Sequence, residues 1–408
     1  MRGDGRSRIR SRQTGAGTFF ACMLLALTVG GCKSGREIAK PPAPSSFPPQ
    51  QQAQFRTIVT TALQEGRIPG AIVGIWSADK GNWVEAFGVA DTATGDAMTT
   101  DHQVRIGSIT KSFTATVILQ LVNEGKIDLD DSIEKYVKKH RLTIANGKDI
   151  TIRMLLNHTS GLFSYTDDPA LEAVSYANLL LYWTPEELIN YAVSHRDTSA
   201  PGEAFHYSNT GYALLGLIIE DETGHKLHDE IQHRLLTYLN MTRTRFPVGP
   251  EMDAPYARGY MGNEDLFKLS MNLRDTQQPQ GMTDVTAFNP SWAWAGGGMV
   301  SAIHDLKLYA KLLATGDLVH KKLHRERLKT VPIGPGETGA GYGLGIVNLQ
   351  GFLGHGGDIP GFNCAMYHSP ELDATFIVLL NRQPNKADAM NHILLKLVDV
   401  VYPGKIKK

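Results

Sequence analysis

The sequence predicts a mixed α/β protein in which strands from both ends of the chain form one antiparallel sheet, flanked by helices and interrupted by an inserted, mainly helical region. Three observations support this fold class. Strand-like segments occur near residues 70–90 and again near 344–380, segments with helical periodicity lie between them, and an amphipathic helix closes the chain. A cleft between the sheet and the insertion is the natural place for a site.

The individual elements follow from spacing. Apolar residues at helical intervals predict a first helix over 55–63, and residues 70–78 and 83–90 are expected to be strands around the polar turn 79–82. Further strands are expected over 344–349, 352–356, 362–368 and 375–380, followed by a helix with Met390, Ile393, Leu394, Leu397, Val398 and Val401 on one face. We therefore expect a sheet part at about 52–105 and 290–403, and a helical part at about 106–289.

The composition is that of an ordinary globular protein. Of 408 residues, 42% are hydrophobic and 20% are charged, which suffices for a sizeable core. Basic and acidic residues number 41 each, and the basic residues are not massed outside the N-terminus. A nucleic-acid partner is therefore not expected, and a polyanionic substrate is disfavoured.

Residues 1–31 resemble a bacterial lipoprotein signal peptide. Five arginines precede the apolar run 19–29, which is too short to span a bilayer. The run ends in Val29-Gly30-Gly31-Cys32, which resembles a lipobox. Cys32 is therefore expected to be lipidated and to become the mature N-terminus. The alternatives are a plain signal peptide or an N-terminal anchor. Residues 32–51 are a proline-rich tether and 52–403 the folded domain, which predicts a lipoprotein in the cell envelope, facing the periplasm or the exterior.

The cysteines agree with this placement. Cys22 would leave with the signal peptide and Cys32 would carry lipid, so only Cys364 would keep a free thiol. No intrachain disulfide is then possible. A single thiol in an apolar strand is expected to serve packing and not catalysis.

A serine and a lysine three residues apart form the first candidate site. Ser108 and Lys111 precede a long apolar run, and one helical turn would place the lysine beside the serine at the N-terminus of a helix. Serine needs a neighbouring base or cation to become an effective nucleophile, as acyl transfer requires. The pairs Ser77/Lys80 and Ser132/Lys135 match the same pattern, but the first flanks a hairpin turn and the second begins the next helix.

Two further polar motifs follow along the chain. Tyr207 and Asn209 lie in a turn-rich loop that leads into an apolar helix, a place from which side chains can reach a cleft. The pairs Tyr176/Asn178 and Tyr238/Asn240 fit the same pattern but have helix-like surroundings. The third motif is the glycine-dense stretch 354–361 around His355; its glycines, including Gly356 and Gly357, would let a substrate backbone lie close and leave N–H groups available as oxyanion donors.

The ordered motifs Ser-x-x-Lys, Tyr-x-Asn and His-x-Gly resemble those of the serine β-lactamase and penicillin-recognising DD-peptidase family, particularly its class C β-lactamase and D-alanyl-D-alanine carboxypeptidase branch. Supporting stretches are Leu155 to Leu162 (LLNHTSGL), the Pro-Gly to Tyr-Ser-Asn-x-Gly-Tyr loop, and Ala295 to Ser301 (AGGGMVS). The resemblance covers roughly residues 52–402. It implies a β-lactamase/transpeptidase-like fold and acyl-enzyme chemistry without a cofactor.

The resemblance also implies roles for the matched residues. Ser108 would be the acylated nucleophile, Lys111 its activating partner and Tyr207 the proton shuttle. Asn209 would contact a substrate amide, and His355 stands where the family usually has lysine. The backbone N–H groups of Ser108 and Asp358 would form the oxyanion hole.

Physical reasoning leaves the identity of the base open, since free lysine and tyrosine both titrate near ~10 and either must be perturbed to accept a proton at neutral pH. Trp292 and Trp294 are expected either to wall the cleft or to pack in the core. No metal site is expected, because His320 and His324 lack the remaining pattern of a zinc motif.

Two departures from the family pattern bear on the substrate. Gly356 replaces the usual threonine or serine, and the stretch Gly341 to Gly345 leads to Ile346, Val347 and Asn348, where DD-carboxypeptidase relatives have an arginine. Both absent groups help to bind a substrate carboxylate, and only Asn348 and a charged His355 offer partial compensation.

These inferences predict an envelope-anchored serine hydrolase, most like a D-alanyl-D-alanine carboxypeptidase acting on peptidoglycan-type peptides or related D-amino-acid amides. A carboxylesterase and a class C-like β-lactamase are alternatives with the same chemistry. A catalytically silent penicillin-binding or sensor lipoprotein is the alternative from a different class.

Overall fold

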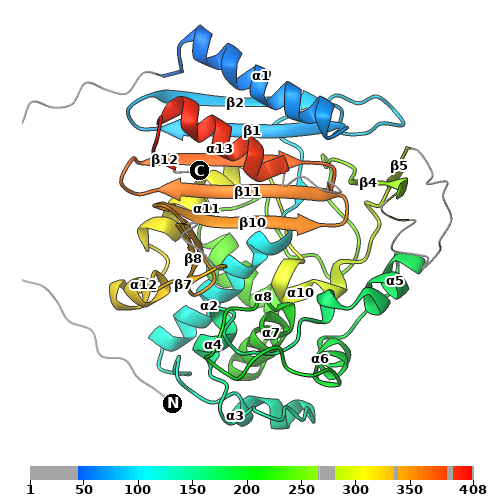
Figure 1. The fold of residues 1–408 in the computed structure, drawn as a ribbon, viewed down its shortest axis with the longest axis vertical. Helices are drawn as coiled ribbons and strands as arrows, with labels where there is room; N and C mark the ends of the chain where they lie inside the picture. Colours follow the sequence, from blue (N-terminus) through cyan, green and yellow to red (C-terminus); the bar gives the residue numbers. More distant parts are fainter. Residues whose placement is uncertain (1–44, 265, 267–280, 335–338, 384–388, 407–408) are drawn as a thin grey trace, which may run out of the picture. The chain divides into compact units, whose positions relative to one another are not determined.

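Strands from both chain ends form an eight-stranded antiparallel sheet, as the sequence predicts (Figure 1). This computed structural model describes residues 45–264, 266, 281–334, 339–383 and 389–406. The strand order is β2-β1-β12-β11-β10-β9-β8-β7. The bounds are β1 (Gly70–Ser77), β2 (Gly81–Gly88), β7 (Val331–Pro332), β8 (Ala340–Tyr342), β9 (Val347–Leu349), β10 (Phe352–Ile359), β11 (Phe362–Ser369) and β12 (Ala374–Leu380).

Strand β1 joins the two halves of the sheet. It pairs with β2 as the predicted hairpin and with β12 from the other end of the chain, so that Ala71 faces both Phe87 and Leu380. All of β1 is buried. Because side chains alternate across a strand, Val73 enters one hydrophobic core and Ile72 the other.

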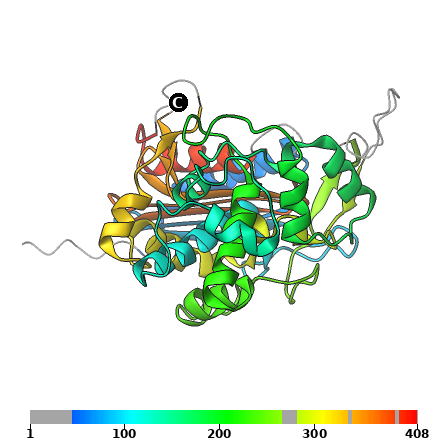
Figure 2. The ribbon, with the colours of Figure 1, turned by 90° about the horizontal axis from the view of Figure 1, so that it is seen from below.

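Helices cover both faces of the sheet. The helices α1 (Pro49–Glu65) and α13 (Ala389–Val401) pack together on one face, as Figure 2 shows, and α11 (Ile303–Thr315) packs against strands of the other face. The first helix begins before the expected domain start at residue 52. Proline is well tolerated in the first turn of a helix, and Phe47 just before it is buried, so the ordered fold includes the end of the expected tether.

The insertion between β2 and β7 is mainly helical, as predicted. It contains α2 (Thr110–Asn123), α3 (Glu134–Val137), α4 (Ile152–Leu156), α5 (Pro169–Ala177), α6 (Pro185–Val193), α7 (Asn209–Thr223), α8 (Leu227–Ile231), η1 (Gly107–Ile109), η2 (Lys138–His140), η3 (Tyr165–Asp167) and the π-helical turn η4 (Gln232–Thr237). Among the described residues, no helix has both the length and the apolar character needed to cross a bilayer.

The chain then returns toward the sheet through short elements. These are η5 (Pro290–Trp292), α10 (Trp294–Gly297), α12 (Lys321–Arg327), and the strand pairs β3 (Val104–Arg105) with β6 (Val300–Ser301) and β4 (Tyr260–Gly262) with β5 (Met282–Asp284). Because α10 packs on α2 and α7, the helical part extends beyond the expected boundary at residue 289.

Helix α2 is the central helix of the insertion and the scaffold of the site. From Thr110 to Leu119 every residue is buried, as expected for a helix that is surrounded by protein on all sides. It contacts β10 of the sheet and the helices α7 and α10. Its N-terminal end therefore lies where the sheet edge and the helical region meet.

Candidate active site

Strand β10 passes very close to the segment that carries Ser108. Gly107 has a φ of +49°, and a Cβ at that position would lie 2.8 Å from the backbone nitrogen of Asp358. A Cβ at Gly357 would lie 1.9 Å from the carbonyl oxygen of Ile106 and 3.3 Å from the backbone nitrogen of Ser108. Glycine is required at both positions for this approach. The two backbone N–H groups predicted to form an oxyanion hole thus come from adjacent segments.

The Lys111 ammonium group lies in the middle of the site. This residue is fully buried, and its Nζ is 3.1 Å from Ser108 Oγ, 2.6 Å from Asn209 Oδ1 and 2.8 Å from the carbonyl oxygen of Gly296. The last two partners are oxygens that only accept hydrogen bonds. A neutral amine would donate to both of them and direct its lone pair at the Ser108 hydroxyl.

Burial favours that neutral form. Removing the ammonium from water holds the pKa of Lys111 well below its ordinary value of 10.5. A lysine with a depressed pKa whose free lone pair faces a serine hydroxyl has the arrangement of a general base. The geometry therefore favours Lys111 as the group that accepts the Ser108 proton.

Tyr207 completes this cluster. The Lys111 nitrogen lies 4.7 Å from the centre of the Tyr207 ring. Burial raises the pKa of Tyr207 above its ordinary value, and a hydrogen bond with Ser108 acts in the opposite direction. The phenol therefore keeps its proton while Lys111 is neutral, which suits a group that passes a proton on.

Asn209 is held at both ends of its amide. Its Oδ1 accepts from Lys111, and its Nδ2 donates to Thr166 Oγ1 at 2.9 Å. Its backbone N–H donates to Ser164 Oγ at 3.1 Å. The residue was expected to contact substrate, but these contacts make it first a support that orients Lys111. Thr166 and Ser164 carry no sequence signal for this role.

His355 differs from the expectation of a charged side chain. It is 4% exposed, and burial lowers its pKa to about 3, so it is neutral at physiological pH. Its Nδ1 donates to the Gly356 carbonyl oxygen at 2.5 Å, which leaves Nε2 to accept from the Tyr342 hydroxyl at 2.7 Å. Asn348 accepts from the Gly351 N–H through its Oδ1 at 2.8 Å, so its amide oxygen is bound in a turn. His355 therefore does not supply the expected cation for a substrate carboxylate.

The predicted wall residue Trp292 lines a cavity of about 90 Å³ next to Asp358. Trp294 does not share this cavity; its indole lies against Gly216 of α7, in a different hollow. We call the cavity beside Trp292 the Asp358 cavity; it adjoins the site through Asp358, and its lining consists of Thr166, Leu171, Glu172, Ser175, Tyr176, Phe288, Trp292, Asp358, Ile359, Pro360 and Gln383. Among these described residues two are carboxylates, and none is lysine, arginine or histidine.

The carboxylates of this cavity differ in environment. Asp358 is exposed, with one oxygen 3.3 Å from Asn363 Nδ2. Glu172 is half-buried, and burial raises its pKa. Gly356 faces away from the nucleophile: a Cβ there would lie 2.7 Å from the side chain of Met390 in α13.

His158 is a residue whose role the sequence did not reveal, although it lies in the motif stretch Leu155 to Leu162. It is 1% exposed and has a φ of +62°, an uncommon conformation for a histidine. Its Nδ1 accepts from the Ser208 N–H at 3.1 Å, its carbonyl accepts from the His206 N–H at 2.8 Å, and its ring centre is 4.2 Å from that of Tyr207. It thereby fixes the loop that presents Tyr207.

The remaining candidate groups lie outside this cluster. Cys364 is a buried free thiol in β11 whose pKa is raised by burial, which suits packing. No group of three His, Cys, Asp or Glu residues within the described part of the chain is arranged to hold a metal ion. Cys32 lies outside the described residues.

Comparison with known proteins identifies the family of the chain. A family model described as Beta-lactamase matches residues 55–399. Protein flp of Staphylococcus aureus (strain MRSA252) is 29% identical over 338 residues, which are 81% of this chain and 63% of flp. Penicillin-binding protein 4* of Bacillus subtilis (strain 168) is 26% identical over 347 residues, which are 82% of this chain and 72% of that protein. The chain thus spans less than two thirds of the length of flp.

Solved structures show the same similarity. The D-stereospecific amidohydrolase from Streptomyces sp. is 31% identical with a TM-score of 0.72, covering 85% of this chain and 98% of that one. The D-amino acid amidase from Ochrobactrum anthropi SV3, complexed with D-phenylalanine, is 26% identical with a TM-score of 0.72, covering 86% and 99% of the two chains.

Proposed function

The chain belongs to the β-lactamase family, and we propose that it is a serine hydrolase that cleaves amides of D-amino acids whose amino group is free. The sequence predicts peptidoglycan-type peptides or related D-amino-acid amides as substrates. We select the second of these two substrate classes. The names of the Streptomyces and Ochrobactrum neighbours support the choice of D-amino-acid amides.

The observation that carries the proposal is the charge of the Asp358 cavity, which adjoins the predicted oxyanion hole through Asp358. Glu172 and Asp358 line it, and no described cationic side chain does. A substrate ammonium group would be attracted by these carboxylates, whereas a terminal carboxylate would be repelled. The raised pKa of Glu172 means that its charge is costly without a partner, and a bound ammonium would remove that cost.

The aromatic walls limit the substrate side chain. Tyr176, Phe288 and Trp292 contribute rings to a cavity of about 90 Å³. Such walls suit a compact apolar group. Small D-amino acids such as D-alanine are therefore the expected acyl part.

The reaction follows from the cluster around Lys111. Lys111 accepts the Ser108 proton as Oγ bonds to the substrate carbonyl carbon, and the backbone N–H groups of Ser108 and Asp358 stabilise the negative oxygen. Tyr207 passes a proton to the leaving nitrogen as the C–N bond breaks. Water then cleaves the Ser108 ester, which releases the amino acid and restores the hydroxyl.

The decisive test compares D-alanine p-nitroanilide with its desamino analogue, propionyl p-nitroanilide, and with the L-enantiomer. We expect Glu172→Gln to lower kcat/KM for the amine substrate by about tenfold to a hundredfold, as for loss of a charge-assisted contact, and to leave the desamino substrate unaffected. Glu134→Gln, far from the site in α3, is the matched control. Equal losses on both substrates would contradict amine recognition.

A D-alanyl-D-alanine carboxypeptidase is the second candidate, supported by the similarity to Penicillin-binding protein 4*. Assays of D-alanine release from an N-acylated D-alanyl-D-alanine peptide, of ester cleavage and of β-lactam hydrolysis, in parallel with the anilides, separate the candidates. Faster turnover of the N-acylated peptide than of the free amine would replace the amidase proposal by the carboxypeptidase. An ester or β-lactam preference would likewise favour the esterase or class C-like alternative.

We further propose that the enzyme is exported and anchored through Cys32, on the strength of the arginine-rich apolar leader and the lipobox-like sequence. Metabolic labelling with a palmitate analogue should mark the wild type and not Cys32→Ala. Labelling of both would contradict the anchor.

A further inference from the structure

A second cavity lies on the other side of the segment that walls the active site. It measures about 340 Å³, within the 300–1,000 Å³ range typical of small-molecule sites. In the segment 290–297, Trp292 lines the Asp358 cavity and Trp294 lines this one. We call it the Trp294 cavity; its lining includes Tyr182, Glu186, Glu220, Phe246, Val248 and Trp294.

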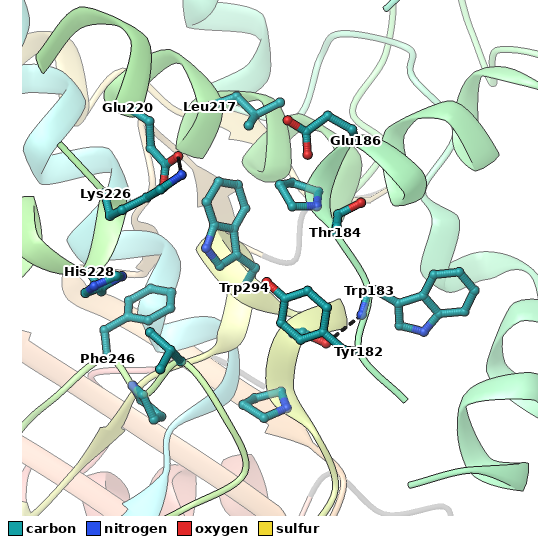
Figure 3. A pocket seen from close by; sticks show the side chains of 15 residues that line it. Tyr182, Trp183, Thr184, Glu186, Leu217, Glu220, Lys226, His228, Phe246 and Trp294 are labelled. Atoms are coloured by element: carbon teal, nitrogen blue, oxygen red, sulfur yellow. Dashed lines mark hydrogen bonds and ion pairs between the residues drawn. The ribbon is translucent and has the colours of Figure 1, made fainter. Parts of the chain in front are cut away.

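Aromatic side chains surround this hollow while remaining in reach of solvent. Figure 3 shows the Trp294 indole near the centre of the cavity, whose lining also includes Phe246 and Tyr182. Tyr182 is 58% exposed, and Val248 at the rim is 70% exposed. Exposed apolar side chains that gather at a hollow are typical of surfaces that bind a ligand or a partner.

The position of the Trp294 indole is costly for the fold. Trp294 has a φ of +28°, a strained backbone for a bulky residue. Its ring also requires a glycine in the interior of α7, because a Cβ at Gly216 would lie 2.5 Å from the indole. The strained backbone of Trp294 and the glycine at position 216 thus both hold one aromatic ring in the cavity wall.

The charges of the lining are mostly negative. Glu220 is paired with Lys226 at 2.8 Å and also accepts from the Leu227 N–H at 3.0 Å, so the Lys226 charge is matched. The second lining carboxylate, Glu186, lies 3.1 Å from His140 Nδ1. The lining histidine, His228, is 3.5 Å from Asp229. Glu220 contributes most to raising the pKa of Lys226 and Glu186 contributes further, so the lining holds two carboxylates and one lysine.

From these features we infer that the Trp294 cavity binds a small organic ammonium ion. The faces of tryptophan, tyrosine and phenylalanine rings attract a cation, and this attraction grows where water is excluded. Glu186 supplies the balancing charge. The site is separate from the one proposed for the substrate amine, since their linings share no residue.

A ligand in the Trp294 cavity would affect the catalytic residues through α10. Trp294 and Gly296 belong to the same short helix, and the Gly296 carbonyl accepts from Lys111 at 2.8 Å. A ligand that moves the indole therefore shifts an acceptor of the catalytic lysine. The expected consequence is a changed rate of Ser108 acylation.

The binding test uses the full chain with Ser108 blocked by a fluorophosphonate, which closes the active site. Isothermal titration with choline is compared with 3,3-dimethylbutan-1-ol, its uncharged isostere. We expect choline to bind and the alcohol to bind at least about tenfold more weakly. Equal affinities, or loss of choline binding when Ser108 is blocked, would overturn the assignment.

Variants locate the site. Tyr182→Ala and Glu186→Gln should each weaken choline binding by about threefold to tenfold, whereas Tyr238→Ala, at an 81% exposed position outside the cavity, and Glu134→Gln should not. Unchanged binding in both cavity variants would contradict the proposal. With unblocked protein, choline should change the rate of fluorophosphonate labelling in the wild type, and Glu186→Gln should need about threefold to tenfold more choline for the same change. An unchanged wild-type rate would refute the link to Lys111.

Discussion

The chain contains the same four-residue pattern in two different settings. In the first, Lys111 is fully buried and its nitrogen contacts Ser108, Asn209 and Gly296. In the second, the Lys80 side chain is 47% exposed and is 3.2 Å from Asp79 in a hairpin turn. Ser77 is buried, but its hydroxyl bonds to Tyr402 at 2.7 Å and to Asp79 at 2.8 Å.

The difference shows that Ser-x-x-Lys has no chemistry of its own. A lysine in water keeps its proton and cannot serve as a base near neutral pH. Lys111 is buried, its hydrogen-bond partners in the described part of the chain include no carboxylate, and burial lowers its pKa. The partners other than Ser108 only accept hydrogen bonds, and they orient the lone pair of the neutral amine. At the hairpin, the neighbouring lysine pairs with Asp79 in contact with solvent, and the serine hydroxyl is engaged in structural hydrogen bonds.

The largest contrast is expected from removing each serine. Ser108→Ala should abolish fluorophosphonate labelling and lower turnover by about 10⁴-fold or more, because the nucleophile is lost. Ser77→Ala should label and turn over as the wild type does. Labelling stoichiometry by mass spectrometry checks both. Residual full activity in Ser108→Ala would end the acyl-enzyme mechanism on this residue.

The lysines should differ in activity and in the pH dependence of stability. Lys111→Met should lower turnover by about 10²- to 10⁴-fold, whereas Lys80→Met should not. The pKa of Lys111 is lower in the folded chain than in the unfolded chain. Between these two pKa values, the unfolded chain binds a proton that the folded chain lacks. The free energy of unfolding of the wild type therefore rises with pH up to about 10.5, by as much as ~1.4 kcal/mol per pH unit.

Lys111→Met removes this contribution. The stability of Lys111→Met relative to the wild type should therefore be highest at low pH and decline as the pH rises toward 10.5. Urea unfolding at several pH values measures it, with Lys80→Met as the control. A relative stability of Lys111→Met that does not vary with pH would show that Lys111 is charged in the folded protein.

The contrast also shows what sequence reasoning reaches. Periodicity located the terminal strands and helix α13, and the order of motifs selected Ser108 among three matches. It did not show that His355 is neutral, because that depends on Tyr342 and on burial by segments distant in sequence. The roles of Asn209 and Gly296 as Lys111 acceptors depend in the same way on how α7 and α10 meet α2.

Variants of His158 test whether a residue outside the Ser108/Lys111 pair helps to position the catalytic groups. His158→Ala removes the acceptor of the Ser208 N–H and places alanine at a φ of +62°, so turnover should fall by about tenfold through loss of Tyr207 positioning. His158→Asn should restore part of the rate, since asparagine accepts a hydrogen bond and tolerates this backbone conformation. Fluorophosphonate labelling rates distinguish this from global unfolding, and equal losses in both variants would argue against a positioning role.

The smallest effect is expected at the hairpin itself. Lys80 and Asp79 form a half-exposed ion pair, and such pairs contribute about 0–1 kcal/mol because water screens them and both side chains lose freedom. Ser77 makes buried hydrogen bonds, so Ser77→Ala should cost about 1 kcal/mol or somewhat more. Urea unfolding should therefore rank Ser77→Ala as more destabilised than Lys80→Ala, with turnover unchanged in both. A catalytic defect in Lys80→Ala would mean that exposure does not separate the two lysines, and the comparison would have to rest on the contacts of Ser108 alone.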